Sequence, residues 1–379
     1  MRYCKNCLTT DLRPNAQFYG GICIACRYTS KNKSGPGSLK LEILKKLIAE
    51  AQKKKRSKSP YDCIVGVSGG KDSTRQAHWV RDRLGLRPLL VCAAYPPKQM
   101  STVGAENLSN LISMGFDMMT VTPAPKTAAE LALESFEKFG NVCKSTEMSL
   151  FSTVPRLAIE HNINIIFWGE NPALQVGDSA VEGVDEFDGN NLRKLNTLTE
   201  GGDKWIKDFV TEAHKAEHYI YPDEIRFKKK KVNIFYLGAT WDDWSNEENS
   251  TYAALQGLRL RPDDEGETGD ISNASMLDEE FTNINMMLKY YKFGFGRTTD
   301  LVNEKIRDGK LSREEGIKIV KRYDGVCSDR IIKSFCDYLG IKPDKFWSIT
   351  HKWVNEELFE IQSNARPRPK FDVGIDYES

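Results

Sequence analysis

The sequence predicts an α/β protein in which a parallel sheet follows a small cysteine-rich module and precedes a helical C-terminal region. Three observations predict this organisation. Two Cys-x-x-Cys pairs lie in the first 26 residues, short apolar runs alternate with helical patterns through the middle of the chain, and helical periodicity dominates from about residue 255. We therefore expect three domains, at residues 1–38, 39–250 and 251–379.

The N-terminal module carries the pairs Cys4-x-x-Cys7 and Cys23-x-x-Cys26. Each pair can place two sulfurs on one metal ion, and the 15-residue spacer allows the chain to close a tetrahedron. Four sulfur ligands leave no open position, so we predict a structural Zn²⁺ site. An iron–sulfur cluster and disulfides are the alternatives. The other five cysteines are isolated in the sequence.

The amino-acid composition limits the classes of protein to which the chain can belong. The 379 residues carry a net charge of +1, but residues 1–60 hold 14 Lys/Arg against 3 Asp/Glu. This basic segment fits nucleic acid, an acidic partner or the chain's own acidic remainder. The sequence shows neither a signal peptide nor an apolar run long enough to span a membrane. We expect a soluble, cytoplasmic protein whose thiols stay reduced.

The middle of the chain alternates strand and helix patterns. After a basic linker and a helix at 39–52, we expect strands at 62–67, 88–94, 117–121, 164–168 and 232–237, with helices at 73–84, 103–114, 127–139 and 149–162. Alternation of this kind predicts a parallel sheet covered on both faces. Ligands bind such sheets at the carboxyl ends of the strands, so the loops there are expected to converge on one site.

The first of these loops is the strongest functional signal. Ser68-Gly69-Gly70-Lys71-Asp72-Ser73 joins the first strand to a helix. Small residues let backbone N–H groups surround a phosphate, and the helix N-terminus favours negative charge. The spacing is not that of a Walker A loop. The string resembles the PP-loop of ATP pyrophosphatases, which release pyrophosphate from ATP and leave AMP on the substrate; an ordinary strand-to-helix turn is the alternative.

The C-terminal region is predicted to be helical. Helices are expected at 277–291, 299–307, 312–321 and 329–339, and a capping box opens the third, at Ser312-Arg313-Glu314-Glu315. The tail after residue 365, with two Arg-Pro units followed by Lys370, is expected to be extended.

Further motifs extend the resemblance over nearly the whole chain. They are Trp168-Gly169-Glu170-Asn171-Pro172 after the fourth strand, Lys292-Phe293-Gly294-Phe295-Gly296-Arg297 with Thr298-Thr299-Asp300, and Ile306-Arg307-Asp308-Gly309-Lys310 running on to Asp324-Gly325. Together with the paired cysteines and the PP-loop, they resemble the N-acetyl sugar amidotransferases of bacterial lipopolysaccharide O-antigen and flagellar-glycan pathways. Residues 173–180 resemble this family less.

The resemblance implies an ATP-dependent amidotransferase. The oxygen of an acetamido group attacks the α-phosphate of ATP, pyrophosphate leaves, and ammonia then displaces AMP to give an acetamidino group. An amide carbon is a poor electrophile and its oxygen a poor leaving group, and adenylation improves both. The implied substrate is a nucleotide-linked or free diacetamido sugar acid, such as a UDP-linked uronic acid or a nine-carbon acid.

The resemblance also implies roles for individual residues. We expect Ser68, Gly69, Gly70 and Ser73 to surround the phosphates, Lys71 to offset their charge and Asp72 to bind Mg²⁺. Nucleotide contacts are expected at Gly66, Ala94 and Gly169, leaving-pyrophosphate contacts at Lys292 and Arg297, and acetamide or ammonia contacts at Glu170 and Asn171. Ordinary roles compete: a carboxylate at a helix N-terminus for Asp72, solvated helix-end charges for Lys292 and Arg297, and loop capping for Glu170.

Ammonia requires a source. The sequence shows no Gly-x-Cys-x-Gly elbow and no cysteine directly after Met1, so we expect no glutaminase within this chain. The resemblance implies two partners, a separate glutaminase and a barrel-shaped ammonia-channelling protein, both similar to the pair of the histidine pathway. Free ammonium is the alternative.

Two other classes of function compete. A tRNA-thiolating enzyme can also combine a cysteine knuckle with a PP-loop, but it needs catalytic or cluster-binding cysteines in the PP-loop domain, where Cys143 is isolated. The chain after residue 60 carries 40 Lys/Arg against 50 Asp/Glu, which disfavours RNA as a partner. A zinc module with a vestigial ATP domain fits poorly, because the 68–73 motif is complete.

Overall fold

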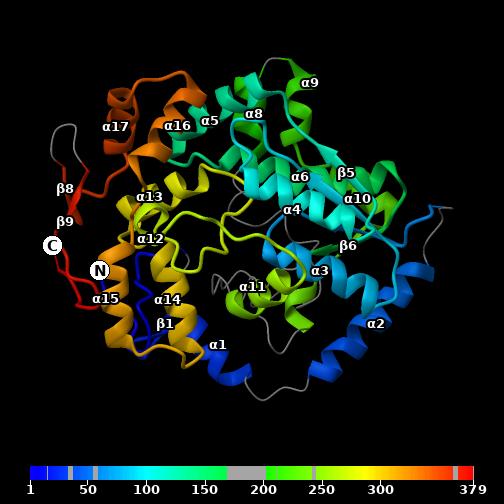
Figure 1. Ribbon diagram of the computed structural model, residues 1–379, viewed down its shortest axis with the longest axis horizontal. Helices are drawn as coiled ribbons and strands as arrows, with labels where there is room; N and C mark the ends of the chain where they lie inside the picture. Colours follow the sequence, from blue (N-terminus) through cyan, green and yellow to red (C-terminus); the bar gives the residue numbers. More distant parts are fainter. Residues whose placement is uncertain are drawn as a thin grey trace.

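The predicted parallel sheet is confirmed in the computed structural model, which describes residues 1–14, 16–32, 37–53, 59–168, 202–210, 212–240, 245–361 and 366–378 (Figure 1). Its strand order is β5-β4-β3-β6-β7, and all neighbouring pairs are parallel. The strands are β3 (Cys63–Gly66), β4 (Pro88–Ala93), β5 (Met118–Val121), β6 (Ile165–Trp168) and β7 (Asn233–Tyr236). Each lies inside its predicted range.

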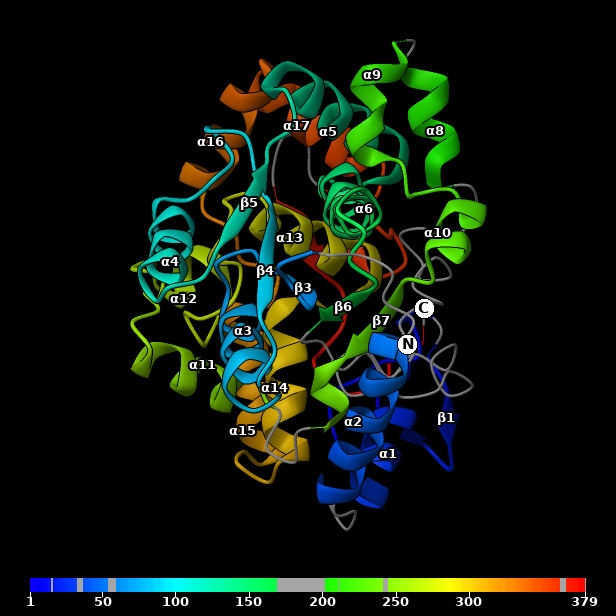
Figure 2. The same cartoon turned by 90° about the vertical axis from the view of Figure 1, so that its right-hand side faces the viewer.

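Helices cover both faces of the sheet (Figure 2). On one face, α2 (Gly37–Lys53), α3 (Lys71–Asp82) and α4 (Thr102–Ser113) pack on side chains such as Val65 and Phe167. On the other, α6 (Lys144–Glu160) and α10 (Glu224–Lys230) pack on their neighbours Ile64 and Ile166. Because successive strand residues point to opposite faces, fully apolar strands supply both cores.

Further elements complete the middle of the chain. They are α5 (Pro125–Phe139), α8 (Gly202–Phe209), α9 (Ala213–Ala216), η3 (Glu217–Tyr219), η4 (Leu237–Thr240) and α11 (Asn246–Leu255). The helix predicted at 149–162 begins five residues earlier, as α6, and contains Pro155. Proline removes one backbone donor without ending this helix, because ten of its side chains are buried by the surrounding structure.

The C-terminal region is helical, as predicted. It contains α12 (Glu265–Thr268), α13 (Thr282–Phe293), α14 (Arg297–Arg307), α15 (Arg313–Tyr323), α16 (Asp329–Leu339) and α17 (Pro343–His351), followed by β8 (Phe359–Glu360) and β9 (Arg368–Pro369). The capping box at Ser312 and Glu315 is present. Helix α17 was not among the predicted helices, and α13 begins at Thr282, later than the predicted start at residue 277.

The late start of α13 has a local cause. Glu279 makes an antiparallel bridge with Met100, so the chain is extended there. The Glu279 carboxylate accepts hydrogen bonds from the backbone N–H groups of Phe281, at 2.7 Å, and Thr282. These donors lie at the helix start and lack partners within the helix. Glu279 is therefore the last part of the extended segment, and its side chain caps the start of α13.

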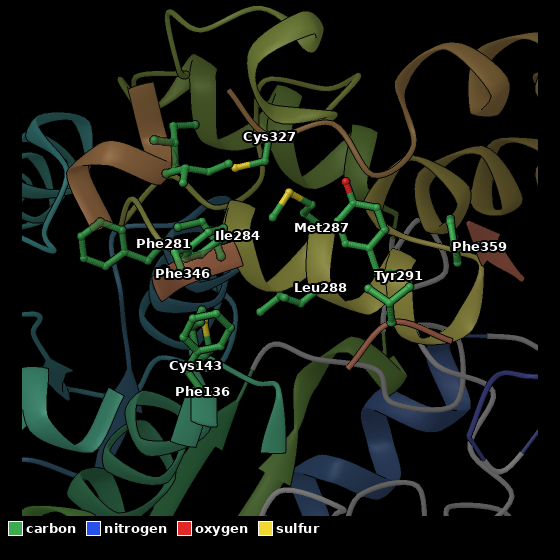
Figure 3. Packing of buried hydrophobic residues seen from close by; sticks show 14 of the residues in the cluster. Phe136, Cys143, Phe281, Ile284, Met287, Leu288, Tyr291, Cys327, Phe346 and Phe359 are labelled. Atoms are coloured by element: carbon green, nitrogen blue, oxygen red, sulfur yellow. The ribbon is translucent and has the colours of Figure 1, made fainter. Parts of the chain in front are cut away.

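The largest apolar core joins the C-terminal helices to α5 (Figure 3). Phe136 of α5 is fully buried. Its ring centroid lies 6.0 Å from that of Phe335 in α16 and 5.4 Å from that of Phe346 in α17. Tyr3 and Leu8 of the N-terminal module belong to the same core. Residues from all three parts of the chain thus share one apolar interior.

The N-terminal module consists of β1 (Phe18–Tyr19), β2 (Ile22–Cys23) and α1 (Ile24–Asn32). It lies beside α14 and α15, and the two ends of the chain meet there (Figure 1). The backbone N–H of Tyr377 donates to the carbonyl of Met1 at 2.8 Å, and that of Tyr3 donates to the Asp376 carboxylate at 2.7 Å. The predicted extended tail therefore runs back along the N-terminal module.

Within the ranges that the structure describes, no helix has both the length and the apolar character needed to cross a membrane.

Replacing Phe136 with alanine tests the shared core. Loss of this fully buried ring should lower the free energy of unfolding by about 3–5 kcal/mol. Leu255→Ala is the control, because Leu255 is 80% exposed and its loss should change stability by at most about 0.5 kcal/mol. Urea titrations measure both; equal effects would contradict the packing of α5 on the C-terminal helices.

Candidate active site

The 68–73 loop connects β3 to α3 with backbone geometry suited to an anion. Gly69 has a φ of +87°, and a Cβ placed on it would lie 2.9 Å from the carbonyl oxygen of Gly104 in α4. Both features require glycine. Gly70 precedes α3 and supplies no side-chain cap, while the Ser73 and Thr74 hydroxyls donate to its carbonyl at 3.1 and 2.9 Å. This leaves the N–H groups of the first turn of α3 available to a bound anion.

Lys71 and Asp72 form a buried ion pair at the start of α3. The Lys71 Nζ lies 2.8 Å from Asp72 Oδ2, and the Lys71 side chain is 7% exposed. Asn249 of α11 donates to Asp72 Oδ1 at 2.6 Å. Burial raises the pKa of Asp72, but the charge of Lys71, the hydrogen bonds and the charge of Arg297 outweigh burial, so the net pKa lies below its ordinary value. Asp72 is therefore an ionised carboxylate at the end of the loop, where α3 begins.

The C-terminal region contributes a second carboxylate, Asp278. Its oxygen Oδ2 accepts a hydrogen bond from the Tyr95 hydroxyl at 2.9 Å, and its backbone carbonyl accepts one from the N–H of Ser101 at 3.2 Å. Burial raises the pKa of Asp278, and Tyr95, Ser68 and Lys71 partly offset that effect. Asp278 thus lies at the loop, close enough to both Ser68 and Lys71 to interact with them.

Of the two predicted pyrophosphate contacts, Arg297 is the one that lies near the loop. It is the first residue of α14, it donates to the Ser275 hydroxyl, and its charge lowers the pKa of Asp72. Within the described residues, its buried Nε has no hydrogen-bond partner. Such a guanidinium has donors left for a ligand.

Lys292 has different surroundings. Its Nζ donates to the carbonyl of Phe139 at 2.8 Å and lies 5.1 Å from the centroid of the Trp353 ring. Burial, followed by the charge of Lys144, lowers the pKa of Lys292. These partners belong to the end of α5 and to the segment after α17. A role for Lys292 at the phosphates stays a prediction.

Two of the remaining predicted nucleotide contacts, Gly66 and Ala94, lie at strand ends. Gly66 ends β3, and a Cβ there would lie 2.6 Å from the indole nitrogen of Trp168. Ala94 follows β4, is buried, and donates its N–H to the carbonyl of Val121 at 2.8 Å. Gly169, Glu170 and Asn171 lie outside the described residues. All these roles stay predictions.

The four cysteines predicted to bind metal do come together. Their Sγ atoms lie within 4.8 Å of one another and all four residues are buried. Cys7 and Cys23 have a Sγ–Sγ distance of 3.7 Å, close to the separation of about 3.8 Å in a tetrahedral zinc–thiolate site. The backbone N–H of Cys23 donates to Cys4 Sγ at 3.3 Å. All nine cysteines are free thiols in the described chain, so the disulfide alternative is wrong and the cluster can bind a metal.

The N-terminal module, with its four-cysteine cluster and here also called the metal module after the ion that the cluster could bind, is attached to α14. Asn303 accepts the N–H of Leu8 at 2.6 Å and donates to the Thr9 hydroxyl at 3.2 Å. Arg13 forms an ion pair with Asp300, and Arg313 of α15 donates to the carbonyl of Cys7 at 3.4 Å. Since α14 begins at Arg297, the module braces the helix that carries this arginine.

Sequence reasoning missed Tyr95, Asn249 and Asp278. Asn249 and Asp278 lie 177 and 183 residues from their hydrogen-bond partners Asp72 and Tyr95. Contacts between residues so far apart in the sequence cannot be predicted from a local sequence pattern. For Asp278 a usable signal was its position before a helix and beside a second acid, Glu279, but the apolar periodicity had suggested that it was helical.

Comparisons with known proteins give a family for the C-terminal region. Residues 276–370 match the family described as LPS biosynthesis protein WbpG-like, C-terminal domain. This segment, which contains Asp278 and Arg297, is therefore similar to the C-terminal domain of a lipopolysaccharide-biosynthesis protein family. The expected resemblance to enzymes of bacterial surface polysaccharides is confirmed at this level. A search of curated proteins finds no match.

Two solved structures show a distant likeness to this chain. A U34-tRNA thiolase, NcsA from Methanococcus maripaludis with its 4Fe-4S cluster, is 13% identical, covers 73% of this chain and 78% of its own, and has a TM-score of 0.32. An NH3-dependent NAD synthetase from Campylobacter jejuni is 16% identical, covers 59% of this chain and 99% of its own, and has a TM-score of 0.27. At these TM-scores neither likeness supports an inference about function.

Replacing Gly69 with alanine tests the loop geometry. The new Cβ would strain a positive φ and meet the Gly104 carbonyl, so stability should fall by about 1–3 kcal/mol and pyrophosphate binding should weaken. Gly85→Ala is the matched control, because Gly85 has a φ of +64° with nothing within 4 Å. Thermal unfolding with and without pyrophosphate compares them. Identical behaviour of the two variants would contradict the tight contact at Gly69.

Replacing Cys7 with serine tests the metal site. Loss of one of four sulfurs should release most of the bound metal and destabilise the module, because metal binding and folding are coupled in such sites. Cys336→Ala removes an isolated buried thiol and should keep the metal content of the native protein. Elemental analysis of the purified variants measures both. An unchanged metal content in the Cys7 variant would contradict the prediction that the four cysteines bind a metal.

Proposed function

We propose that this protein uses ATP to convert an acetamido group of a bacterial surface sugar into an acetamidino group. ATP is split to AMP and pyrophosphate, and ammonia supplies the new nitrogen. The atoms of the overall reaction balance. The amide oxygen leaves in AMP, and an NH group from ammonia replaces it. The other two hydrogens of ammonia are released as protons or retained by the phosphate products.

One observation carries the proposal. The 68–73 loop has glycine geometry suited to phosphate, and two residues of the lipopolysaccharide-family segment, Asp278 and Arg297, lie beside it. A phosphate-type loop alone is compatible with many ATP-using enzymes. Its combination with this family segment favours a reaction of surface-polysaccharide synthesis.

The chain's own residues support phosphoryl chemistry in this way. The N–H groups at the start of α3 and the Lys71 ammonium stabilise phosphate charge, and Arg297 offers free donors to the leaving pyrophosphate. Asp72 and Asp278 are the oxygen ligands that would hold Mg²⁺, which offsets phosphate charge when bound. Positioning the acetamido oxygen in line with the α-phosphate then lowers the barrier.

The second step needs ammonia. After adenylation the acetamido carbon carries AMP as a good leaving group, so a neutral ammonia molecule can attack it. We propose that a separate glutaminase and an ammonia-channelling barrel protein supply the ammonia. Glu170 and Asn171, which follow β6 in the sequence, stay our proposal for the contacts to the acetamide or ammonia. Because ATP is a cytoplasmic substrate, we place the reaction in the cytoplasm.

The cysteine cluster fits a structural role in this reaction. We propose Zn²⁺ as its metal, since the four sulfurs fit a closed tetrahedron. All nine cysteines lie in the described ranges, and the only group among them that could hold a metal is the N-terminal one. Cys143 is buried, which raises its pKa. These observations favour the amidotransferase over the tRNA-thiolating alternative.

Replacing Asp72 with asparagine tests the proposed function. The fold should survive, because asparagine has the same shape, while pyrophosphate release should fall at least about a hundredfold. The assay combines ATP, Mg²⁺, ammonium and a panel of diacetamido sugar acids. Asp82→Asn, a change to an exposed acid of the same helix, should retain activity. Full activity in the Asp72 variant would contradict the mechanism.

A further inference from the structure

A buried charge cluster connects the metal module to the site. Asp300 of α14 pairs with Arg13 of the module through Oδ1, and with Lys289 of α13 through Oδ2 at 2.5 Å. The three side chains are only 15–23% exposed. The Phe295 ring lies against both cations, with centroid distances of 4.5 Å to the Arg13 guanidinium and 4.7 Å to Lys289 Nζ. Two cations from different elements thus occupy the two oxygens of one carboxylate.

Asp300 is ionised in this environment. Burial raises its pKa, but Arg13, Lys289 and Arg297 outweigh burial and hold the pKa well below its usual range. The neighbouring Asp324 accepts hydrogen bonds from the N–H of Gly296 at 2.8 Å and from the hydroxyl of Thr299 at 2.5 Å. The charge of Arg297 therefore acts on Asp300, which Arg13 and Lys289 already pair, and also on Asp72 of the 68–73 loop.

Within this charge cluster, Arg297 is the cation that keeps hydrogen-bond donors available for a ligand. It precedes Asp300 by three residues on α14, a spacing at which arginine and aspartate commonly pair. In the described part of the chain its one hydrogen-bond partner is instead the Ser275 hydroxyl, and its Nε is buried without a partner. Burying an N–H group without a partner is costly. An anion at Arg297 would satisfy that donor.

We propose that Arg13 of the metal module is a positioning residue for pyrophosphate: together with Lys289 it occupies Asp300 and so keeps Arg297 free for the leaving anion. The inference rests on the proposed function for the identity of that anion. Without Arg13, Asp300 has a free oxygen close to Arg297, and an Arg297–Asp300 pair would compete with the ligand. The metal module then contributes to catalysis through charge as well as through packing.

A purely structural role for Arg13 makes a different prediction. Arg13 also ties the module to α14, but Asn303 and Arg313 hold the module independently. If Arg13 acts by neutralising Asp300, removing the Asp300 charge should compensate for its loss. If Arg13 acts as a tether, an Asp300 change cannot restore the lost contact.

The experiment is a mutant cycle on the full-length, metal-loaded protein, with magnesium pyrophosphate as the calorimetric probe. Arg13→Gln should weaken pyrophosphate binding about tenfold, the cost of one charge-assisted hydrogen bond. Arg13→Gln combined with Asp300→Asn should restore binding to within about threefold of the native protein. Arg13→Lys, which keeps the charge, and Arg2→Gln, which alters an exposed pair of the same module, should bind like the native protein.

Metal content and thermal unfolding of each variant verify that the module is intact. Native binding in Arg13→Gln, or equally weak binding in the double variant, would overturn the inference. Failure of the native protein to bind pyrophosphate would overturn both this inference and the proposed function. If the variants bind pyrophosphate as expected but no sugar is converted to an amidine, the inference about Arg13 holds and the proposed function alone is overturned.

Discussion

Three backbone segments meet beside the 68–73 loop with no side chain between them. Gly69 lies against the carbonyl of Gly104, and a Cβ on Gly104 would come within 2.6 Å of the Cα of Asp278. This stacking of two glycines allows the C-terminal region to approach the loop closely enough for its acids and Arg297 to act there. The rest of the site depends on this contact, because Asp278 and Arg297 are far in the sequence from Lys71 and Asp72 of the loop.

The same dependence explains what the sequence could and could not predict. The strands were found because buried parallel strands are apolar runs, as in β3 and β6. The 68–73 loop was found because its glycines, lysine and serine are contiguous, and the metal site because its pairs have a recognisable spacing. Asp278, Asn249 and Arg13 were not assigned roles, since each acts on a partner more than 170 residues away.

Local context also misled the prediction at one boundary. The apolar spacing after Leu277 is compatible with a helix, but the bridge between Met100 and Glu279 keeps the chain extended there. Tertiary contact overrides helical propensity at this point, and the change of conformation directs Asp278 toward the loop. Asp278 thus enters the site from a segment where the local sequence pattern and the observed fold disagree.

The four-cysteine module belongs to the same architecture. Its residues Tyr3 and Leu8 enter the C-terminal core, and its hydrogen bonds to Asn303 fix it on α14. A metal bound by the four buried sulfurs would stabilise a segment too short to fold on its own core. In this protein that stability supports Arg13 and, through Asp300, the arginine at the start of α14.

An isotope experiment tests the central claim most directly. Diacetamido sugar acids labelled with ¹⁸O in the acetamido groups are incubated with the protein, ATP, Mg²⁺ and ammonium, and the products are weighed by mass spectrometry. Attack of the acetamido oxygen on the α-phosphate predicts ¹⁸O in AMP, none in pyrophosphate, and NH in place of oxygen in the sugar. Label in pyrophosphate, or an amidine formed without labelled AMP, would contradict the account.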